Sequence, residues 1–120
     1  MIVVLFEVTV KMGCMDQYLA LAGDLKESLA KEEGFIRAER FSSLSTEGKL
    51  LSLSVWENEE AVQKWRNREQ HRMSQRQGRD SIFESYMITV VSSIRAYSDR
   101  GRMEAPEDSN KEFGVEPDAS

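Results

Sequence analysis

Apolar residues recur with two different periods along most of the chain. Four segments have the β-branched, aromatic or alternating composition that is typical of strands, namely 2–10, 35–42, 49–56 and 86–97. In residues 15–32 the apolar positions recur every three or four residues, as on one face of a helix: Tyr18, Ala22, Leu25 and Leu29. A second helix is expected after Asn58, which is a suitable N-cap, because Glu59 and Glu60 suit the positive first turn of a helix.

Turn residues separate these elements and fix their order. Gly34 is expected to end the first helix in the left-handed conformation, and residues 45–48 predict the turn of a hairpin. The resulting order is βαββαβ, which predicts an α+β, ferredoxin-like fold. This fold has a four-stranded antiparallel sheet with two helices on one face, because crossover connections are right-handed.

The third strand alternates strictly between two kinds of residue. One set is Leu51, Leu53 and Val55, and the other is Ser52, Ser54 and Trp56. Side chains alternate between the two faces of a strand. Trp56 is therefore expected to point away from the leucines, either into the core or into a dimer interface.

The sheet face that the helices leave bare is predicted to be apolar. In the first strand Val4 and Phe6 point to one side, while Val3 and Leu5 point to the other. An exposed apolar face of this size marks a surface for a partner. The simplest partner is a second copy about a two-fold axis, so the sequence predicts a homodimer. In the alternative, aromatic side chains and the C-terminal residues cover this face within one chain.

The C-terminal residues differ in composition from the rest of the chain. Residues 99–120 contain both prolines, seven acidic residues, three basic residues and few apolar ones. Such a segment buries too little surface to offset the entropy lost on ordering. The sequence therefore predicts one ferredoxin-like domain at 1–98, followed by a flexible acidic tail at 99–120.

Charge and composition exclude several classes of protein. The chain of 120 residues has a net charge of −5, which does not favour generic nucleic-acid binding. Its N-terminus lacks the basic region and cleavage site of a signal peptide, and no apolar run is long enough to span a membrane. Cys14 is the only cysteine, so no intramolecular disulfide forms. These features predict a cytoplasmic protein without a nucleic-acid or membrane partner.

Positive charge is concentrated in residues 64–79, which hold six basic residues and one acidic residue. Four arginines would share one side of a continuous helix and form a basic stripe: Arg68, Arg72, Arg76 and Arg79. Such a stripe is suited to binding carboxylates or phosphates. It is equally suited to meeting the acidic tail of its own or a neighbouring chain, or to being a solvated helix face.

The segment SVWENEEAVQKW, residues 54–65, leads from the third strand into the second helix and holds two tryptophans. With Gly34 and Phe35 before the second strand, and with the βαββαβ order over residues 2–97, it resembles the antibiotic biosynthesis monooxygenase (ABM) family. The resemblance implies a dimeric α/β barrel with a cleft between sheet and helices. It also implies an oxidoreductase that acts on a hydrophobic, aromatic small molecule with molecular oxygen, without a flavin or metal cofactor.

Five residues are candidates for the chemistry of this cleft. Trp65 is expected either to pack under the sheet or to form a wall on which a flat substrate stacks. His71, Arg72 and Tyr86 are polar groups suited to helping remove a phenolic proton. Glu7 would become a desolvated carboxylate if its side chain entered the cleft.

Two other functions stay open. Family members that degrade heme carry a tryptophan matching Trp65, an asparagine on the first strand and an axial histidine after the second helix. This chain has no asparagine in its first strand, and His71 follows Trp65 by only six residues. If heme binds, His71 is its candidate ligand, whereas a zinc site is not expected around this lone histidine. The third function is a non-catalytic domain that binds a small molecule.

Overall fold

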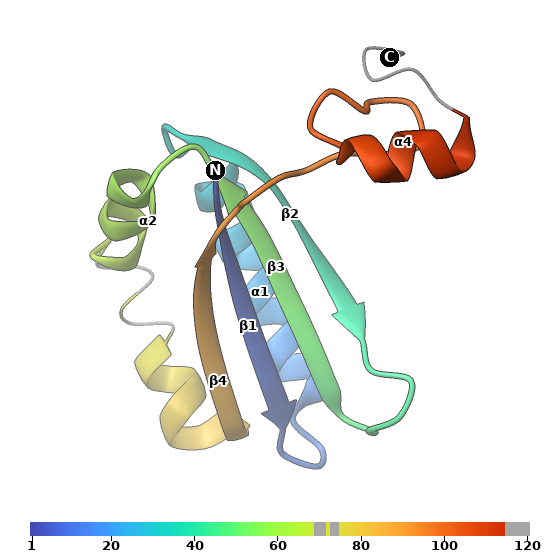
Figure 1. Ribbon diagram of the computed structural model, residues 1–120. Coiled ribbons are helices and arrows are strands. Elements are labelled where there is room, and N and C mark those ends of the chain that lie inside the picture. Colours follow the sequence, from blue (N-terminus) through green and yellow to red (C-terminus); the bar gives the residue numbers. More distant parts are fainter. Residues whose placement is uncertain (69–71, 73–74, 115–120) are drawn as a thin grey trace.

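The main body of the protein is a four-stranded antiparallel sheet with helices on one side (Figure 1). The computed structural model describes residues 1–68, 72 and 75–114. The strands are β1 (Ile2–Val10), β2 (Phe35–Ser42), β3 (Lys49–Trp56) and β4 (Phe83–Ser92). They lie in the order β2-β3-β1-β4, and each neighbouring pair is antiparallel.

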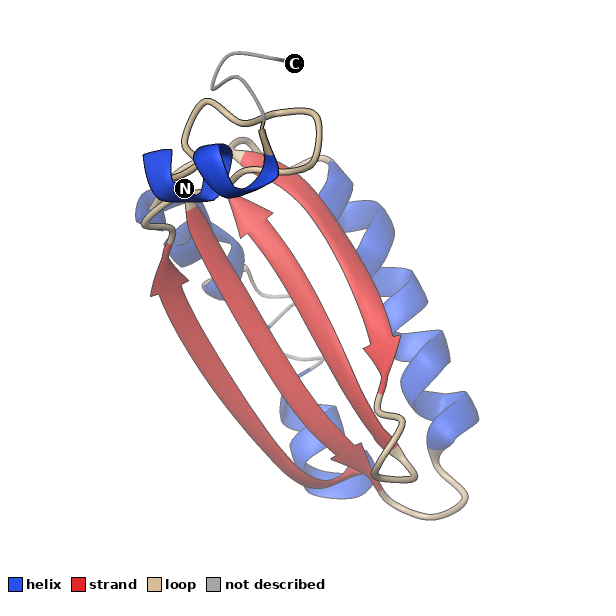
Figure 2. Ribbon diagram, turned by 45° about the vertical axis from the view of Figure 1, so that its right-hand side comes forward, coloured by secondary structure: helices blue, strands red, loops and turns tan. Residues whose placement is uncertain are grey.

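The helices α1 (Met15–Ala30) and α2 (Glu59–Arg66) cover the same face of the sheet (Figure 2). The π-helical turn η1 (Gly78–Ile82) packs against α1 and leads directly into β4. As predicted, Asn58 caps α2, because its side-chain oxygen accepts a hydrogen bond from the Ala61 amide at 2.9 Å. The ferredoxin-like fold is therefore confirmed. Among the described residues, no helix combines the length and apolar character that crossing a bilayer requires.

The strand register defines two faces of the sheet, which we call the covered face and the open face. On the covered face, under the helices, Phe6 lies between Ser52 of β3 and Ile88 of β4. On the open face, Leu5 lies between Leu53 and Thr89. Exposed apolar side chains on the open face include Phe41, Met87 and Val91.

The two faces have an unexpected polarity in β3. Leu51 and Leu53 point to the open face, while Ser52 and Ser54 point under the helices beside the buried Trp56. An ordinary half-buried strand does the reverse, with apolar side chains toward the core. The reversal implies that the covered face borders a space that tolerates polar groups, and that the open face is suited to further burial.

Two aromatic clusters hold the helices on the sheet. In the first, Tyr18 of α1 lies edge-on to Phe83, with ring centroids 5.9 Å apart, over Val8. In the second, Trp56 packs between Phe35 and Trp65, at centroid distances of 5.4 and 6.5 Å. Trp56 is 1% exposed, so its predicted place in the core is confirmed.

The fourth strand is shorter and earlier than predicted. It covers residues 83–92 rather than 86–97, so Ile94 and Tyr97 lie off the sheet. The reason is that β4 pairs only with β1, and β1 begins at Ile2 opposite Ser92. The Ser93 amide makes a last hydrogen bond to the Met1 carbonyl, and no neighbouring strand remains beyond it.

The basic stripe does not lie on one continuous helix, so that prediction is wrong. Helix α2 ends at Arg66, and Asn67 is its C-cap. Arg68 forms an ion pair with Glu32, after the end of α1, at 2.8 Å. Arg76 and Arg79 belong to the separate helical segment that leads into β4, as Figure 1 shows.

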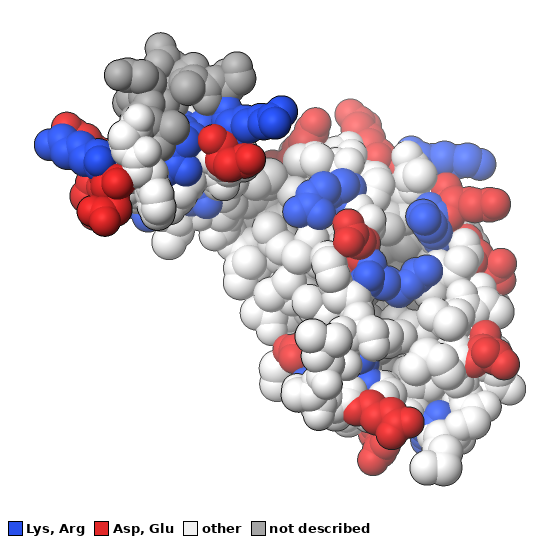
Figure 3. All heavy atoms as spheres, turned by 90° about the vertical axis from the view of Figure 1, so that its right-hand side faces the viewer, with Lys and Arg blue, Asp and Glu red and all other residues white. Residues whose placement is uncertain are grey.

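The tail contains regular structure, which its composition did not predict. Helix α4 (Glu107–Phe113) projects beyond the sheet on the open-face side, and the tail stands off from the body (Figure 3). Arg102, 8% exposed, organises this segment by donating hydrogen bonds to Asn110, Ser109 and the Ser98 carbonyl. Between the described tail residues and the described part of 64–79 there is no ion pair. The flexibility of the tail, the boundary near residue 98 and contact with a neighbouring chain stay predictions.

Replacing Gly34 with alanine is expected to destabilise the fold. Gly34 has a φ of +85°, and an added Cβ would lie 2.6 Å from the Cβ of Ala61 in α2. The left-handed conformation alone costs a non-glycine residue about 1–2 kcal/mol, and the contact adds to this. Urea unfolding measures the loss. The matched control is Gly23→Ala in α1, where nothing lies within 4 Å of the added Cβ. The control is expected to stabilise by about 0.5–1 kcal/mol, and equal effects of both variants would contradict the assignment.

Candidate functional site

A cavity of about 560 Å³ lies between the covered face of the sheet and the helices. Its walls come from α1, α2, β4 and the covered face of all three other strands. This volume is within the range of pockets that hold small organic molecules. The fold therefore forms an internal site at the place where the helices bridge the sheet.

The floor of the cavity consists of two rows of side chains that cross the sheet from β2 to β4. One row is Arg40, Ser52, Phe6 and Ile88. The other row is Ala38, Ser54, Val4 and Val90. Both rows are apolar on β1 and β4, and both carry a hydroxyl on β3. The floor is therefore amphipathic, with its polar half on β2 and β3.

The two tryptophans form one end of the cavity. Trp56 rises from β3 and Trp65 descends from α2, and their rings are tilted by 34° to one another. The Trp56 indole donates a hydrogen bond to the Ser54 hydroxyl at 2.9 Å, which fixes the orientation of its ring. Trp65 is 9% exposed and also borders the cavity, so the structure combines its two predicted placements, packing and cleft wall.

Tyr18 brings a hydroxyl to the other end of the cavity. Its side chain is 4% exposed, and its ring is held edge-on against Phe83. Burial raises the pKa of the Tyr18 hydroxyl above its ordinary value of 10.0, and the positive charge of Arg40 partly opposes this effect. The phenol is therefore neutral near pH 7 and able to donate a hydrogen bond.

Basic side chains surround the entrance. Lys26 from α1, Arg40 from β2 and Arg66 from α2 all border the cavity and are exposed. Figure 3 shows Lys and Arg side chains, interspersed with Asp and Glu side chains, on the edge of the molecule that faces the viewer. The cavity thus joins an apolar interior to an entrance that attracts anions.

Tyr86 lies beside the cavity. It is on the covered face, opposite Val8, and is 43% exposed. Its ring centroid lies 5.9 Å from those of Phe6 and Phe83, two residues that border the cavity. The structure therefore brings Tyr86 close to Trp65's cavity, and the catalytic role of both residues stays a prediction.

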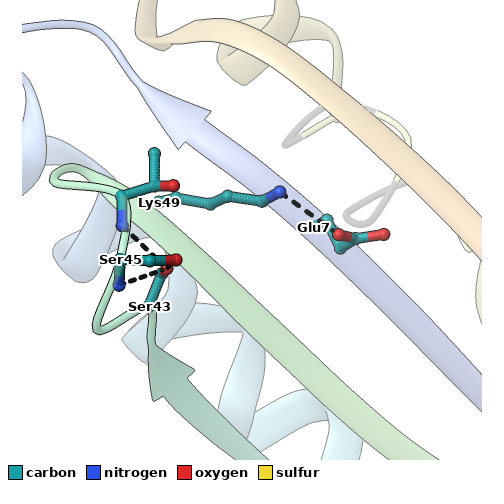
Figure 4. A network of polar contacts seen from close by, with 5 residues as sticks. Glu7, Ser43, Ser45 and Lys49 are labelled. Atoms are coloured by element: carbon teal, nitrogen blue, oxygen red, sulfur yellow. Dashed lines mark hydrogen bonds and ion pairs between the residues drawn. The ribbon is translucent and has the colours of Figure 1, made fainter.

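Glu7 does not enter the cleft, so the expectation that placed it there is corrected. Strand alternation puts Phe6 and Val8 on the covered face and Glu7 on the open face. There the Glu7 carboxylate forms an ion pair with Lys49 at 3.4 Å, beside the turn that Ser43 organises (Figure 4). Its side chain is 40% exposed. In this chain alone, Glu7 is not a base for a molecule in the cavity.

The two remaining candidates, Arg72 and His71, are not among the described residues that border the cavity. Arg72 is exposed, and its guanidinium donates a hydrogen bond to the Asn67 side chain at 2.7 Å. His71 lies outside the described residues, and so does any test of its role as a base or heme ligand. Within residues 1–68, 72 and 75–114, no three His, Cys, Asp or Glu side chains gather as metal ligands.

Sequence reasoning missed the polar residues of the cavity itself, Tyr18, Arg40 and Ser52. Tyr18 was assigned only to the apolar face of α1. The available signal was the alternation in β2 and β3, which places Arg40 and Ser52 opposite one another on a single face. The alternation does not show which face of the sheet the helices cover. Only the tertiary structure shows that they cover this face, which places the positive charge of Arg40 at the cavity.

The chain matches the family model for antibiotic biosynthesis monooxygenase over residues 1–77. It is 40% identical over 99 residues to a protein of Pyricularia oryzae named jasmonate monooxygenase ABM, covering 80% of this chain and 46% of that protein. The chain spans about half the length of the curated relatives that it matches.

Solved structures show the same fold at low sequence identity. A putative antibiotic biosynthesis monooxygenase from Deinococcus radiodurans superposes with a TM-score of 0.74 at 14% identity, covering 82% of this chain and 97% of that one. SnoaB from Streptomyces nogalater, described as a cofactor-independent oxygenase, superposes with a TM-score of 0.70 at 12% identity, covering 79% and 94%. With the family match, the sequence identity and the shared fold in agreement, this chain belongs to the antibiotic biosynthesis monooxygenase family.

Proposed function

We propose that the protein is a monooxygenase that oxidises a hydrophobic, aromatic small molecule inside the cavity between sheet and helices. The observation that carries this proposal is the aromatic cavity of about 560 Å³, bordered by Trp56, Trp65 and Phe83. Aromatic walls hold a flat molecule by stacking and keep water away from it. The family membership and the monooxygenase name of the Pyricularia oryzae relative support the reaction type.

We further propose that the reaction needs no flavin or metal, as the name of the SnoaB structure states for that protein. In such a reaction the substrate itself supplies the electrons. One atom of molecular oxygen becomes a carbonyl oxygen of the product, and the other leaves as water with two hydrogen atoms of the substrate. The protein's part is to bind the substrate, exclude water and assist removal of a proton.

Oxygen consumption by the purified protein tests this function. With an electron-rich polycyclic phenol such as anthrone, the protein is expected to accelerate oxygen uptake without added cofactor and in the presence of a metal chelator. With ¹⁸O₂, the quinone product is expected to contain one labelled oxygen atom. Trp65→Phe is expected to reduce the rate, while Leu44→Ala in the exposed turn between β2 and β3 serves as the control variant. Loss of activity on chelation would contradict a metal-free reaction.

A hemin titration separates the heme alternative from this proposal. The proposed cofactor-free reaction predicts no sharp Soret band on addition of hemin. A band that disappears in His71→Ala would instead support heme binding. Binding of aromatic compounds with neither oxygen uptake nor a heme spectrum would identify a non-catalytic binding domain.

We also propose that the working form is a homodimer that joins two open faces. The support is the apolar character of this face, where Met87 is 62% exposed and Phe41 is 42% exposed in the isolated chain. The reversed polarity of β3 supports the same conclusion, because Leu51 and Leu53 on the open face gain burial from a partner. The cytoplasmic location stays a prediction that the single Cys14 supports.

A further inference from the structure

The cavity has a charged end, and we propose that its ligand is an apolar molecule with a carboxylate, which Arg40 and Tyr18 hold. This inference rests on the proposed use of the cavity as the substrate site. It adds the chemical class of the substrate and the orientation in which the substrate binds.

The polarity of the floor gives the orientation. Along the row that crosses the sheet, Arg40 and Ser52 are followed by Phe6 and Ile88. A wholly apolar ligand would displace water from the floor beside Arg40 and Ser52 without replacing its hydrogen bonds, and a wholly polar ligand would gain nothing from Phe6 and Ile88. A ligand with one charged end and one apolar end satisfies both halves of the floor.

Tyr18 supplies the second, independent observation. Tyr18 is 4% exposed and borders the cavity, and its hydroxyl makes no hydrogen bond within the described part of the chain. The hydroxyl oxygen is not among the buried polar atoms that lack a partner, so it is accessible to a ligand in the cavity. An acceptor on a ligand in the cavity would accept a hydrogen bond from this hydroxyl. The neutral phenol is a donor, which is what a carboxylate oxygen requires.

The charge of Arg40 makes that acceptor an anion. None of the ion pairs among the described residues involves Arg40 or Lys26, so both cations are available to a ligand at the entrance. Glu39 also borders the cavity but follows strand alternation to the open face beside Leu53. A guanidinium offers two parallel donors that match the two oxygens of a carboxylate.

Competition between two matched ligands tests the proposal without relying on catalysis. The probe is N-phenyl-1-naphthylamine, whose fluorescence rises in apolar cavities, and the competitors are 1-naphthylacetate and its methyl ester. The wild-type protein is expected to bind the acid about tenfold more tightly than the ester, since a hydrogen-bonded charge at an exposed entrance contributes about that factor. Raised salt is expected to weaken binding of the acid and to leave binding of the ester unchanged.

Variants identify the residues. Arg40→Gln is expected to lower the affinity for the acid about tenfold and to leave the ester unchanged, and Tyr18→Phe is expected to have a smaller effect of the same kind. The matched control is Arg37→Gln, which removes the same charge from the open-face side of β2, opposite Val55. Circular dichroism and thermal unfolding check that each variant is folded.

The outcomes separate the inference from the proposed function. Equal binding of acid and ester, or equal loss of both in Arg40→Gln, would overturn the carboxylate site while leaving the cavity as an apolar binding site. An effect of Arg37→Gln as large as that of Arg40→Gln would show a general charge effect and would also overturn it. Failure of probe, acid and ester alike to bind would overturn both proposals.

Discussion

Replacing Trp65 with alanine is expected to lower the free energy of unfolding by about 3 kcal/mol. Truncations of buried aromatic residues cost about 3–5 kcal/mol, and the lower end applies because one side of Trp65 already borders the cavity. Urea unfolding followed by circular dichroism measures the change. The control is Leu19→Ala in α1, whose side chain is 44% exposed. Its expected effect is below about 1 kcal/mol.

Trp65→Phe separates packing from ligand binding at the same position. The phenyl ring retains most of the contact with Trp56, so this variant is expected to fold. It offers a smaller surface for stacking, and its affinity for flat aromatic ligands is expected to fall by up to about tenfold. Unchanged ligand affinity together with a large stability loss in Trp65→Ala would show that Trp65 is a packing residue only.

Met87→Lys is expected to convert a dimer into a monomer. Sedimentation of the wild-type protein at micromolar concentration should show about twice the 13.7 kDa of one chain. Met87 lies on the open face opposite Glu7 and is 62% exposed, so a charge there is solvated in the single chain. Between two sheets the same charge would be desolvated twice per dimer, at a cost of several kcal/mol. The dissociation constant is therefore expected to rise by about a hundredfold or more.

The control for this substitution is Leu44→Lys. Leu44 lies in the turn between β2 and β3 and is fully exposed, outside the open face. It adds the same charge and is expected to leave the mass unchanged. A wild-type protein that stays a monomer over the whole concentration series would refute the dimer. If both variants dissociate the dimer equally, the added charge itself causes the dissociation, and its position on the open face does not.

The sequence by itself determined the elements of the fold and their order. Three strands and the start of α2 lie where alternation, turn residues and the Asn58 cap predict them, because these signals act between residues that are close in the chain. The end of β4 was not predictable in this way. It is set by the first residue of β1, a partner more than eighty positions away, which local composition does not encode.

The difference between local signals and contacts with distant residues also explains why the prediction of the basic stripe was wrong. The basic stripe required a helix that continues through residue 79, whereas α2 ends at Arg66 and Arg68 pairs with Glu32 from the end of α1. An ion pair between distant segments competes with continued helix, and spacing along one segment does not reveal it. The helix in the tail was missed for a related reason, since Arg102 gathers its hydrogen-bond partners only after the chain has turned back.

The candidate site depended most on tertiary structure. The sequence placed the two tryptophans near one cleft, because SVWENEEAVQKW joins a strand directly to the helix above it. It assigned Glu7 to the cleft only conditionally, and it could not give Arg40 or Tyr18 a role. Alternation divides a strand's side chains into two sets but does not say which set faces the helices. Packing decides that, and here it put Ser52, Ser54 and Arg40 at the cavity and Leu51 and Leu53 on the open face. The reason is that the aromatic rings of Trp56, Phe6 and Phe83 pack with α1 and α2 on the same side.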